Sequence, residues 1–399
     1  MNLVVNTKKG KTSLPRFSFL ENFVPLLMAL LPIIQPIKTF LPITWSMTAI
    51  IVSLPFIILN LNFRKIRVGL PQILLFVFCA YRVINHGTTV GELGVSVFFV
   101  LFAILCADGQ FDDDYFFRTT VNVSCVAAVI LLLQYLVHIT TGRHLIAFPP
   151  SLLRKGLENY EALIRTGVSF GMYRPSAFFL EPSAFGQYAI PALCFLLFSD
   201  EIDSKNRSLA ALFSVGVVLS TSGIGIAMAV GIWGLYIWKT SVSNRKVKII
   251  RLICIVLAAA VGLAFAIRLP VIQNSIARIF TAIGGESYSA LQGRLGGGSY
   301  YLSQMSRDEL AFGSGDTIQE QLTMYASSFY IIILSEGIVG IALFFIMLLS
   351  LFFKTEGKYR LVTFCMIILT FFTGIYNPQI LAFYFAAVLP GLYRKSSVS

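Results

Sequence analysis

The chain has 399 residues, of which 56% are hydrophobic and only 13% are charged, whereas about 25% of the residues in a soluble domain are charged. This composition excludes a soluble globular protein and predicts an all-α polytopic membrane protein. The net charge of +12 is carried by short loops between apolar runs, which follows the positive-inside pattern and argues against nucleic-acid binding.

Twelve apolar runs predict about twelve spans in a single integral membrane domain, residues 1–399. The segment 1–21 is polar and basic and has no signal-peptide cleavage site, so we expect it to be a cytoplasmic tail. An even number of spans then leaves both termini in the cytoplasm. The predicted spans are 22–37, 42–61, 68–85, 89–107, 115–138, 183–199, 208–221, 223–239, 249–267, 327–352, 361–376 and 378–393.

The seventh and eighth spans are predicted to form a hairpin. The segment 208–238 is too long for one span of about 20 residues and short for two. Basic residues flank it on both sides, and both flanks favour the cytoplasm. The segment must therefore turn back, and Ser220–Gly223 has the composition of a turn.

Two predicted outer loops, about 139–182 and about 268–326, are much longer than the others, and such length usually indicates function. Their basic residues are mostly arginine, whose planar guanidinium binds phosphate or carboxylate through two hydrogen bonds. This preference points to an anionic ligand at the outer face. Structural ion pairs are the alternative for any single arginine.

The first outer loop is expected to contain an amphipathic helix. Pro149–Ser151 is typical of a turn and a helix cap, and apolar residues then recur at helical spacing between 153 and 164. Glu161 and Arg165 form an i,i+4 pair on the opposite face. We predict a helix of about fifteen residues on the outer membrane surface. It serves either as a lid or as a guide for a lipid-linked substrate, with Arg165 reaching the site.

The second outer loop combines a helix with glycine-rich turns. The segment 272–283 has the pattern of another amphipathic helix. Gly293 precedes Arg294 in one glycine-rich turn, and Gly313 and Gly315 form another. Glycine lets backbone N–H groups approach a ligand closely, so these turns are candidate binding segments; flexible connectors are the alternative.

Carboxylates within the apolar runs need partners, because an unpaired charge in lipid is costly. Glu181 opens the sixth predicted span, and Glu336 lies inside the tenth. Arg82 ends the third span and Glu92 opens the fourth, so we expect these two to form a structural ion pair. Glu336 is expected to face the interior of the bundle.

The segment Arg174–Ser183 resembles the pattern Arg-x-x-Gly-x-Phe-x-Glu-Pro-Ser of the Wzy-type polysaccharide polymerases, with Ala177 at the glycine position and one extra residue after the arginine. Ser220–Gly225 resembles the family's Ser-x-Ser-Gly hairpin. Three further matches follow in the family's order: Gly293–Arg294, Phe312–Gly315 and Glu336–Gly340. The related O-antigen ligases share much of this layout.

The resemblance implies a GT-C-like architecture and a glycosyltransferase of the bacterial cytoplasmic (inner) membrane. Such an enzyme transfers a growing glycan from undecaprenyl diphosphate onto a lipid-linked repeat unit at the outer face, for O-antigen, capsule or exopolysaccharide. The implied partners are the lipid-linked oligosaccharide, the bilayer, a chain-length regulator and a flippase. No cofactor is implied.

The implied catalytic residues are Arg174 and Arg294, which neutralise the departing diphosphate, and Glu181, which is the general base or positions the acceptor. The remaining candidates are substrate-binding residues: Arg165, Ser183, Gly293, Gly313, Gly315 and Glu336, with Glu336 also able to orient an arginine. The outer loops have no Asp-rich metal motif, and Asp112–Asp114 is cytoplasmic in this topology, so we expect metal-independent catalysis.

Three other classes compete with a polymerase. An O-antigen-type ligase transfers finished polymer, so the identity of the product distinguishes it from a polymerase. A twelve-helix transporter or flippase predicts charges near the bilayer midplane and pseudo-symmetric halves, whereas the charges here cluster on the outer side. A purely structural scaffold does not require two outer loops rich in arginine and glycine.

Overall fold

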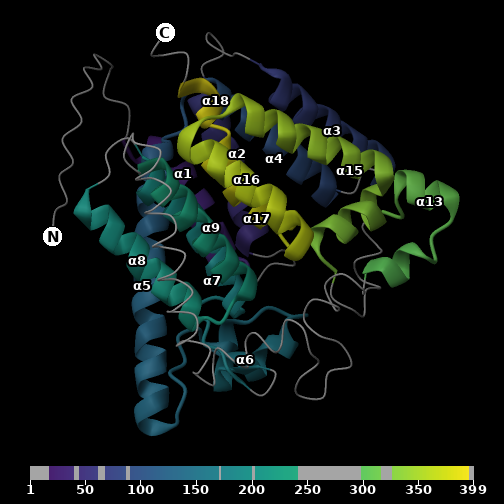
Figure 1. Cartoon of the computed structure of the whole chain (residues 1–399). Helices are drawn as coiled ribbons and strands as arrows, with labels where there is room; N and C mark the ends of the chain where they lie inside the picture. The colour runs from purple at the N-terminus through teal and green to yellow at the C-terminus, as the bar shows by residue number, and fades with distance from the viewer. Residues whose placement is uncertain are drawn as a thin grey trace.

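The computed structural model describes residues 18–39, 45–61, 68–86, 90–169, 172–199, 203–240, 298–315 and 326–394, and most of them are helical. The longer helices pack side by side into a bundle (Figure 1). They are α1 Ser18–Ile34, α2 Trp45–Asn60, α3 Leu70–His86, α4 Val90–Ala107, α5 Asp113–Thr141, α7 Pro182–Phe198, α8 Ser204–Leu219, α9 Gly223–Thr240, α15 Ser328–Lys354, α16 Gly357–Phe372 and α17 Pro378–Val388.

Short elements lie between these helices and at their ends. The segment between α5 and α7 holds two 3-10 turns, a short helix and a two-stranded antiparallel hairpin. They are η1 Pro150–Leu152, η2 Glu158–Tyr160, α6 Glu161–Thr166, β1 Val168–Ser169 and β2 Met172–Tyr173. α13, Arg307–Phe312, packs against α15, and α18, Gly391–Arg394, lies at the opposite end of the bundle from α6 (Figure 1).

Apolar helices dominate the described chain, which confirms the all-α class and supports a membrane-embedded protein. α5, α9 and α15 are long and apolar enough to cross a membrane, and shorter apolar helices accompany them. α5 has 29 residues and is about 43 Å long at 1.5 Å per residue. It extends further than its neighbours, beyond the end of the bundle near α6 (Figure 1).

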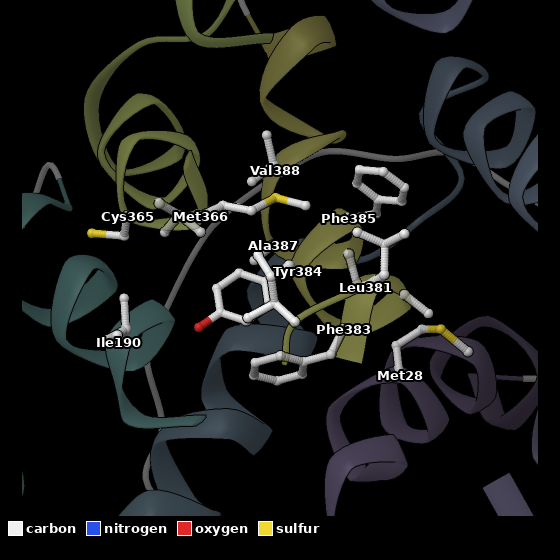
Figure 2. Packing of buried hydrophobic residues seen from close by; sticks show 14 of the residues in the cluster. Met28, Ile190, Cys365, Met366, Leu381, Phe383, Tyr384, Phe385, Ala387 and Val388 are labelled. Atoms are coloured by element: carbon white, nitrogen blue, oxygen red, sulfur yellow. The ribbon is translucent and has the colours of Figure 1, made fainter. Parts of the chain in front are cut away.

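The core is built around α17, whose residues 381–388 are all buried. Figure 2 shows its side chains between Met28 of α1, Ile190 of α7 and Cys365 of α16. Pro191 lacks an N–H, so the Gln187 carbonyl of α7 lacks its helical partner, and the Tyr384 hydroxyl donates to this carbonyl at 2.8 Å. The proline of one helix therefore creates the docking point for another.

The predicted hairpin is confirmed. α8 ends at Leu219 and α9 begins at Gly223, and Thr221 between them has a φ of 53°, in the left-handed region that suits a tight turn. Gly225 of α9 lies against Gly186 of α7, where an added Cβ would lie 3.2 Å from the opposite Cα. The two glycines let α7 and α9 approach closely.

The predicted amphipathic helix after Ser151 is wrong. Leu153 is extended and forms an antiparallel bridge with Ile37 in the connection between α1 and α2. Lys38 N–H donates to Leu152 O at 2.7 Å, and Arg154 N–H donates to Pro36 O at 2.9 Å. Gly156 follows with a φ of 86°, which a helix cannot accommodate. Only the six-residue α6 remains helical. The second predicted amphipathic helix, 272–283, lies outside the described residues.

α15 is broken at Gly337, whose φ of 72° and ψ of −174° are not helical. The break exposes backbone carbonyls, and the loop after α13 binds them: Ser314 N–H donates to Leu334 O at 2.8 Å and Gly315 N–H to Ser335 O at 3.1 Å. A Cβ added at Gly337 would lie 2.3 Å from the Ala311 carbonyl oxygen. The close approach of the two backbones therefore requires glycine.

We predict that Gly337→Ala lowers the stability of the purified protein by at least about 2 kcal/mol, through backbone strain together with the clash. The change is read as a lower thermal unfolding midpoint in detergent. Gly231→Ala, in the exposed interior of α9 with nothing near the added Cβ, is the control and should be neutral or slightly stabilising. Equal midpoints for the two variants would contradict the packing role of Gly337.

Candidate functional site

Arg174 follows β2 directly and is buried against the α8–α9 turn. Its Nε donates to the Thr221 hydroxyl at 2.9 Å, and its Nη1 lies 3.5 Å from the Ser169 hydroxyl. Its backbone N–H donates to Gly167 O at 2.6 Å. The arginine thus joins two motifs from the sequence, the segment Arg174–Ser183 and the hairpin turn. The hydroxyl groups of Thr221 and Ser169 help to orient the guanidinium.

Tyr173 anchors the arginine to the projecting end of α5. Its ring stacks on His138 with 3.7 Å between centroids, and its hydroxyl donates to Gln134 O at 2.9 Å. His144 Nδ1 lies 3.0 Å from the same hydroxyl. Burial lowers the pKa of His144, so this imidazole is neutral at neutral pH. The network is a rigid support for the position of Arg174.

Ala177 stands where the family pattern has glycine, and its φ is 52°. This left-handed backbone favours glycine, so alanine at this position is strained. In this chain the conformation is held by Gln134, whose side-chain oxygen accepts from the Ala177 N–H at 3.0 Å. The same amide donates to Leu145 O at 2.8 Å.

Glu181 lies directly before α7 and is partly exposed. The hydroxyl of Ser183, in the first turn of α7, donates to its carboxylate. Burial and the nearby charge of Glu181 raise the pKa of the Tyr160 hydroxyl to about 12. Ser183 thus binds the Glu181 carboxylate, and the charge of that carboxylate acts on Tyr160. The apolar spacing between 153 and 164 predicts Tyr160 only as part of an apolar helix face.

Glu336 forms a second charged centre at the break in α15. It is fully buried, and its Oε1 accepts from Arg82 Nε at 2.9 Å and from the Tyr376 hydroxyl at 2.7 Å. The Arg82 guanidinium also lies over the Tyr376 ring, 5.3 Å from its centroid. Arg82 was expected to pair with Glu92, whose side chain is outside the described residues. Glu336 therefore pairs with Arg82, which is not among the arginines expected to bind diphosphate.

The glycine turn after α13 has a packing role. Gly313 and Gly315 have φ values of 88° and 80°, and their N–H groups donate to the carbonyls of Glu309 and Ser335. The prediction that these N–H groups bind a ligand is therefore corrected, since both are occupied within the protein. The turn binds the broken helix instead.

Arg165 lies on the surface of α6, where its Nη2 is 2.6 Å from Glu161 Oε1. The predicted i,i+4 pair is thus confirmed, and the guanidinium remains about half exposed. Arg294 and Gly293, the candidates in the first glycine-rich turn, lie outside the described residues. The structure therefore brings together Arg174 with the hairpin turn, and Glu181 with Ser183.

Within the described ranges, no group of three or more His, Cys, Asp or Glu side chains is placed to hold a metal ion. The aspartates 112–114 have structural roles at the start of α5. Asp112 caps the helix, Asp113 accepts from the Tyr359 hydroxyl, and Asp114 lies 3.8 Å from Lys358 Nζ.

No model of a known protein family matches this chain, and no curated protein matches it. The likeness to the Wzy-type polymerases therefore rests on the short motifs and their order. What the geometry itself offers is a buried, hydroxyl-bound guanidinium suited to an anion and a more accessible carboxylate suited to proton transfer.

We predict that Glu336→Gln lowers stability by about 3 kcal/mol, because it removes the buried carboxylate charge that pairs with Arg82. Tyr376→Phe removes only one hydrogen bond to the same carboxylate and should cost about 2 kcal/mol or less. The double variant Arg82→Met/Glu336→Leu should recover most of the loss. The measurement is the thermal unfolding midpoint in detergent. A double variant whose loss of stability equals the sum of the losses in Arg82→Met and Glu336→Leu alone would contradict the pairing.

Proposed function

We propose that this protein is a glycosyltransferase that polymerises lipid-linked oligosaccharides at the outer face of the bacterial cytoplasmic membrane. The observation that carries the proposal is the buried Arg174 bound to Thr221, with Glu181 at the start of the next helix. A buried guanidinium suits the diphosphate of a polyprenyl-linked donor, because its planar fork can bind phosphate oxygens through paired hydrogen bonds. The two motifs that supply this contact are those that resemble the polymerase family.

The proposed reaction needs no nucleotide, because the donor carries its own leaving group. An acceptor hydroxyl oxygen attacks the anomeric carbon of the growing glycan, and a C–O bond forms. The bond from that carbon to the diphosphate oxygen breaks, and the diphosphate leaves with the bonding electrons. Arg174 and Arg294 stabilise the negative charge of the leaving group. Glu181 accepts the proton of the attacking hydroxyl, or positions that hydroxyl.

Several features support the finer topology that the proposal includes, with about twelve spans, a GT-C-like architecture and cytoplasmic termini. α18 and α6 lie at opposite ends of the bundle (Figure 1), which fits a cytoplasmic C-terminus and an outer α5–α7 segment. The α8–α9 hairpin turns at the Arg174 end, which fits two cytoplasmic flanks. The proposed partners are the undecaprenyl-diphosphate-linked oligosaccharide, the lipid bilayer, a chain-length regulator and a flippase.

We predict that Arg174→Ala abolishes long polymer in cells that depend on this gene, while the protein still inserts at normal levels. Arg174→Lys should fail as well, because lysine does not offer a planar bidentate fork. Arg143→Ala, at an exposed arginine of the same segment, is the control and should leave the polymer ladder unchanged. Normal chain length in Arg174→Ala would contradict the assignment, and full-length polymer retained on its lipid carrier would indicate a ligase.

We predict that Glu181→Gln slows transfer by about 100-fold or more, in the range of a lost general base, with the protein folded and the donor still bound. Glu161→Gln is the matched control, because this exposed carboxylate pairs with the surface Arg165. Initial rates in membranes with a synthetic donor and acceptor measure the effect. A wild-type rate for Glu181→Gln would remove Glu181 from the reaction.

A further inference from the structure

Tyr135 has a buried hydroxyl that makes no hydrogen bond within the described residues. The residue lies near the projecting end of α5. Buried polar groups are nearly always hydrogen-bonded, and an unsatisfied one in a folded protein requires an explanation. A bound ligand that supplies the missing partner is one such explanation.

The position of Tyr135 indicates what that ligand is. Its ring packs edge-on against Tyr173, with 5.3 Å between centroids and an interplanar angle of 79°. Tyr173 immediately precedes Arg174, and the positive charge of Arg174 acts on the Tyr135 hydroxyl. A neutral O–H donor beside a fixed cation suits an oxygen that is negatively charged and only accepts hydrogen bonds.

The polar groups beside Tyr135 find their hydrogen-bond partners within the protein. The Tyr173 hydroxyl donates to Gln134 O and lies beside His144. The side-chain oxygen and nitrogen of Gln134 are both bound to backbone groups. This network holds the segment in place without Tyr135, so the Tyr135 hydroxyl is not needed for the local fold.

We propose, resting on the function proposed above, that Tyr135 is a further substrate-binding residue whose hydroxyl donates to a phosphate oxygen of the donor diphosphate held by Arg174. Both groups are shielded from water in this structure, so the diphosphate reaches them only after the outer segment rearranges. The hydrogen bond then forms where water is excluded, and such a bond is stronger than one in solvent.

The test is Tyr135→Phe in the purified full-length protein, with farnesyl diphosphate as the probe and its affinity measured by calorimetry in detergent. The variant keeps the ring contact with Tyr173 and removes only the oxygen. We expect about 10-fold or more weaker binding, the size of effect typical of a hydrogen bond to a charged group. The thermal midpoint of the ligand-free variant should be unchanged or higher, because an unsatisfied buried group is gone.

Tyr173→Phe is the matched structural control and should lower the ligand-free midpoint, because its hydroxyl is bound within the protein. If Tyr135→Phe binds farnesyl diphosphate with unchanged affinity while Arg174→Ala loses binding, the inference about Tyr135 is overturned. The proposed diphosphate site is not affected by that result. A lower ligand-free midpoint in Tyr135→Phe would also overturn the inference about Tyr135, since the hydroxyl would then be structural. No binding of the probe by the wild-type protein would overturn the proposed diphosphate site together with this inference.

Discussion

Buried charges and freed backbone carbonyls in this helical bundle must find partners within the protein, because lipid offers none. The break in α15 shows how the fold meets this constraint. The carbonyls released near Gly337 accept from the loop after α13, and the Glu336 carbonyl accepts from the Tyr81 hydroxyl at 2.7 Å. The Glu336 side chain binds Arg82 and Tyr376. One irregular turn thereby joins α3, α13, α15 and the connection between α16 and α17.

Arg174 and Arg82 lie in different surroundings. Arg82 is bound to a carboxylate inside the bundle, so its charge is compensated and its role is structural. Arg174 contacts the hydroxyls of Thr221, in the α8–α9 turn, and Ser169, at the end of β1. This contrast separates the candidate site from the centre that stabilises the bundle.

Local patterns in the sequence predicted local structure well. The charges on both flanks of residues 208–238 predicted the α8–α9 hairpin, and the spacing of Glu161 and Arg165 predicted their ion pair. Such local patterns do not predict contacts between segments that lie far apart in the sequence. Glu336 lies 254 residues from Arg82, so only the fold shows this pair. The apolar spacing after Ser151 indicated a helix, but residues 36–38 supplied a backbone partner that made the extended form more favourable.

The central claim is that the protein lengthens a glycan on its lipid diphosphate. The most direct measurement uses the purified protein in liposomes with a synthetic undecaprenyl-diphosphate-linked repeat unit, and mass spectrometry of the products with and without a chelator of divalent metals. The account predicts glycans of two or more repeats, released undecaprenyl diphosphate and no effect of the chelator. Lipid-linked repeats that are moved across the bilayer but never joined would contradict it.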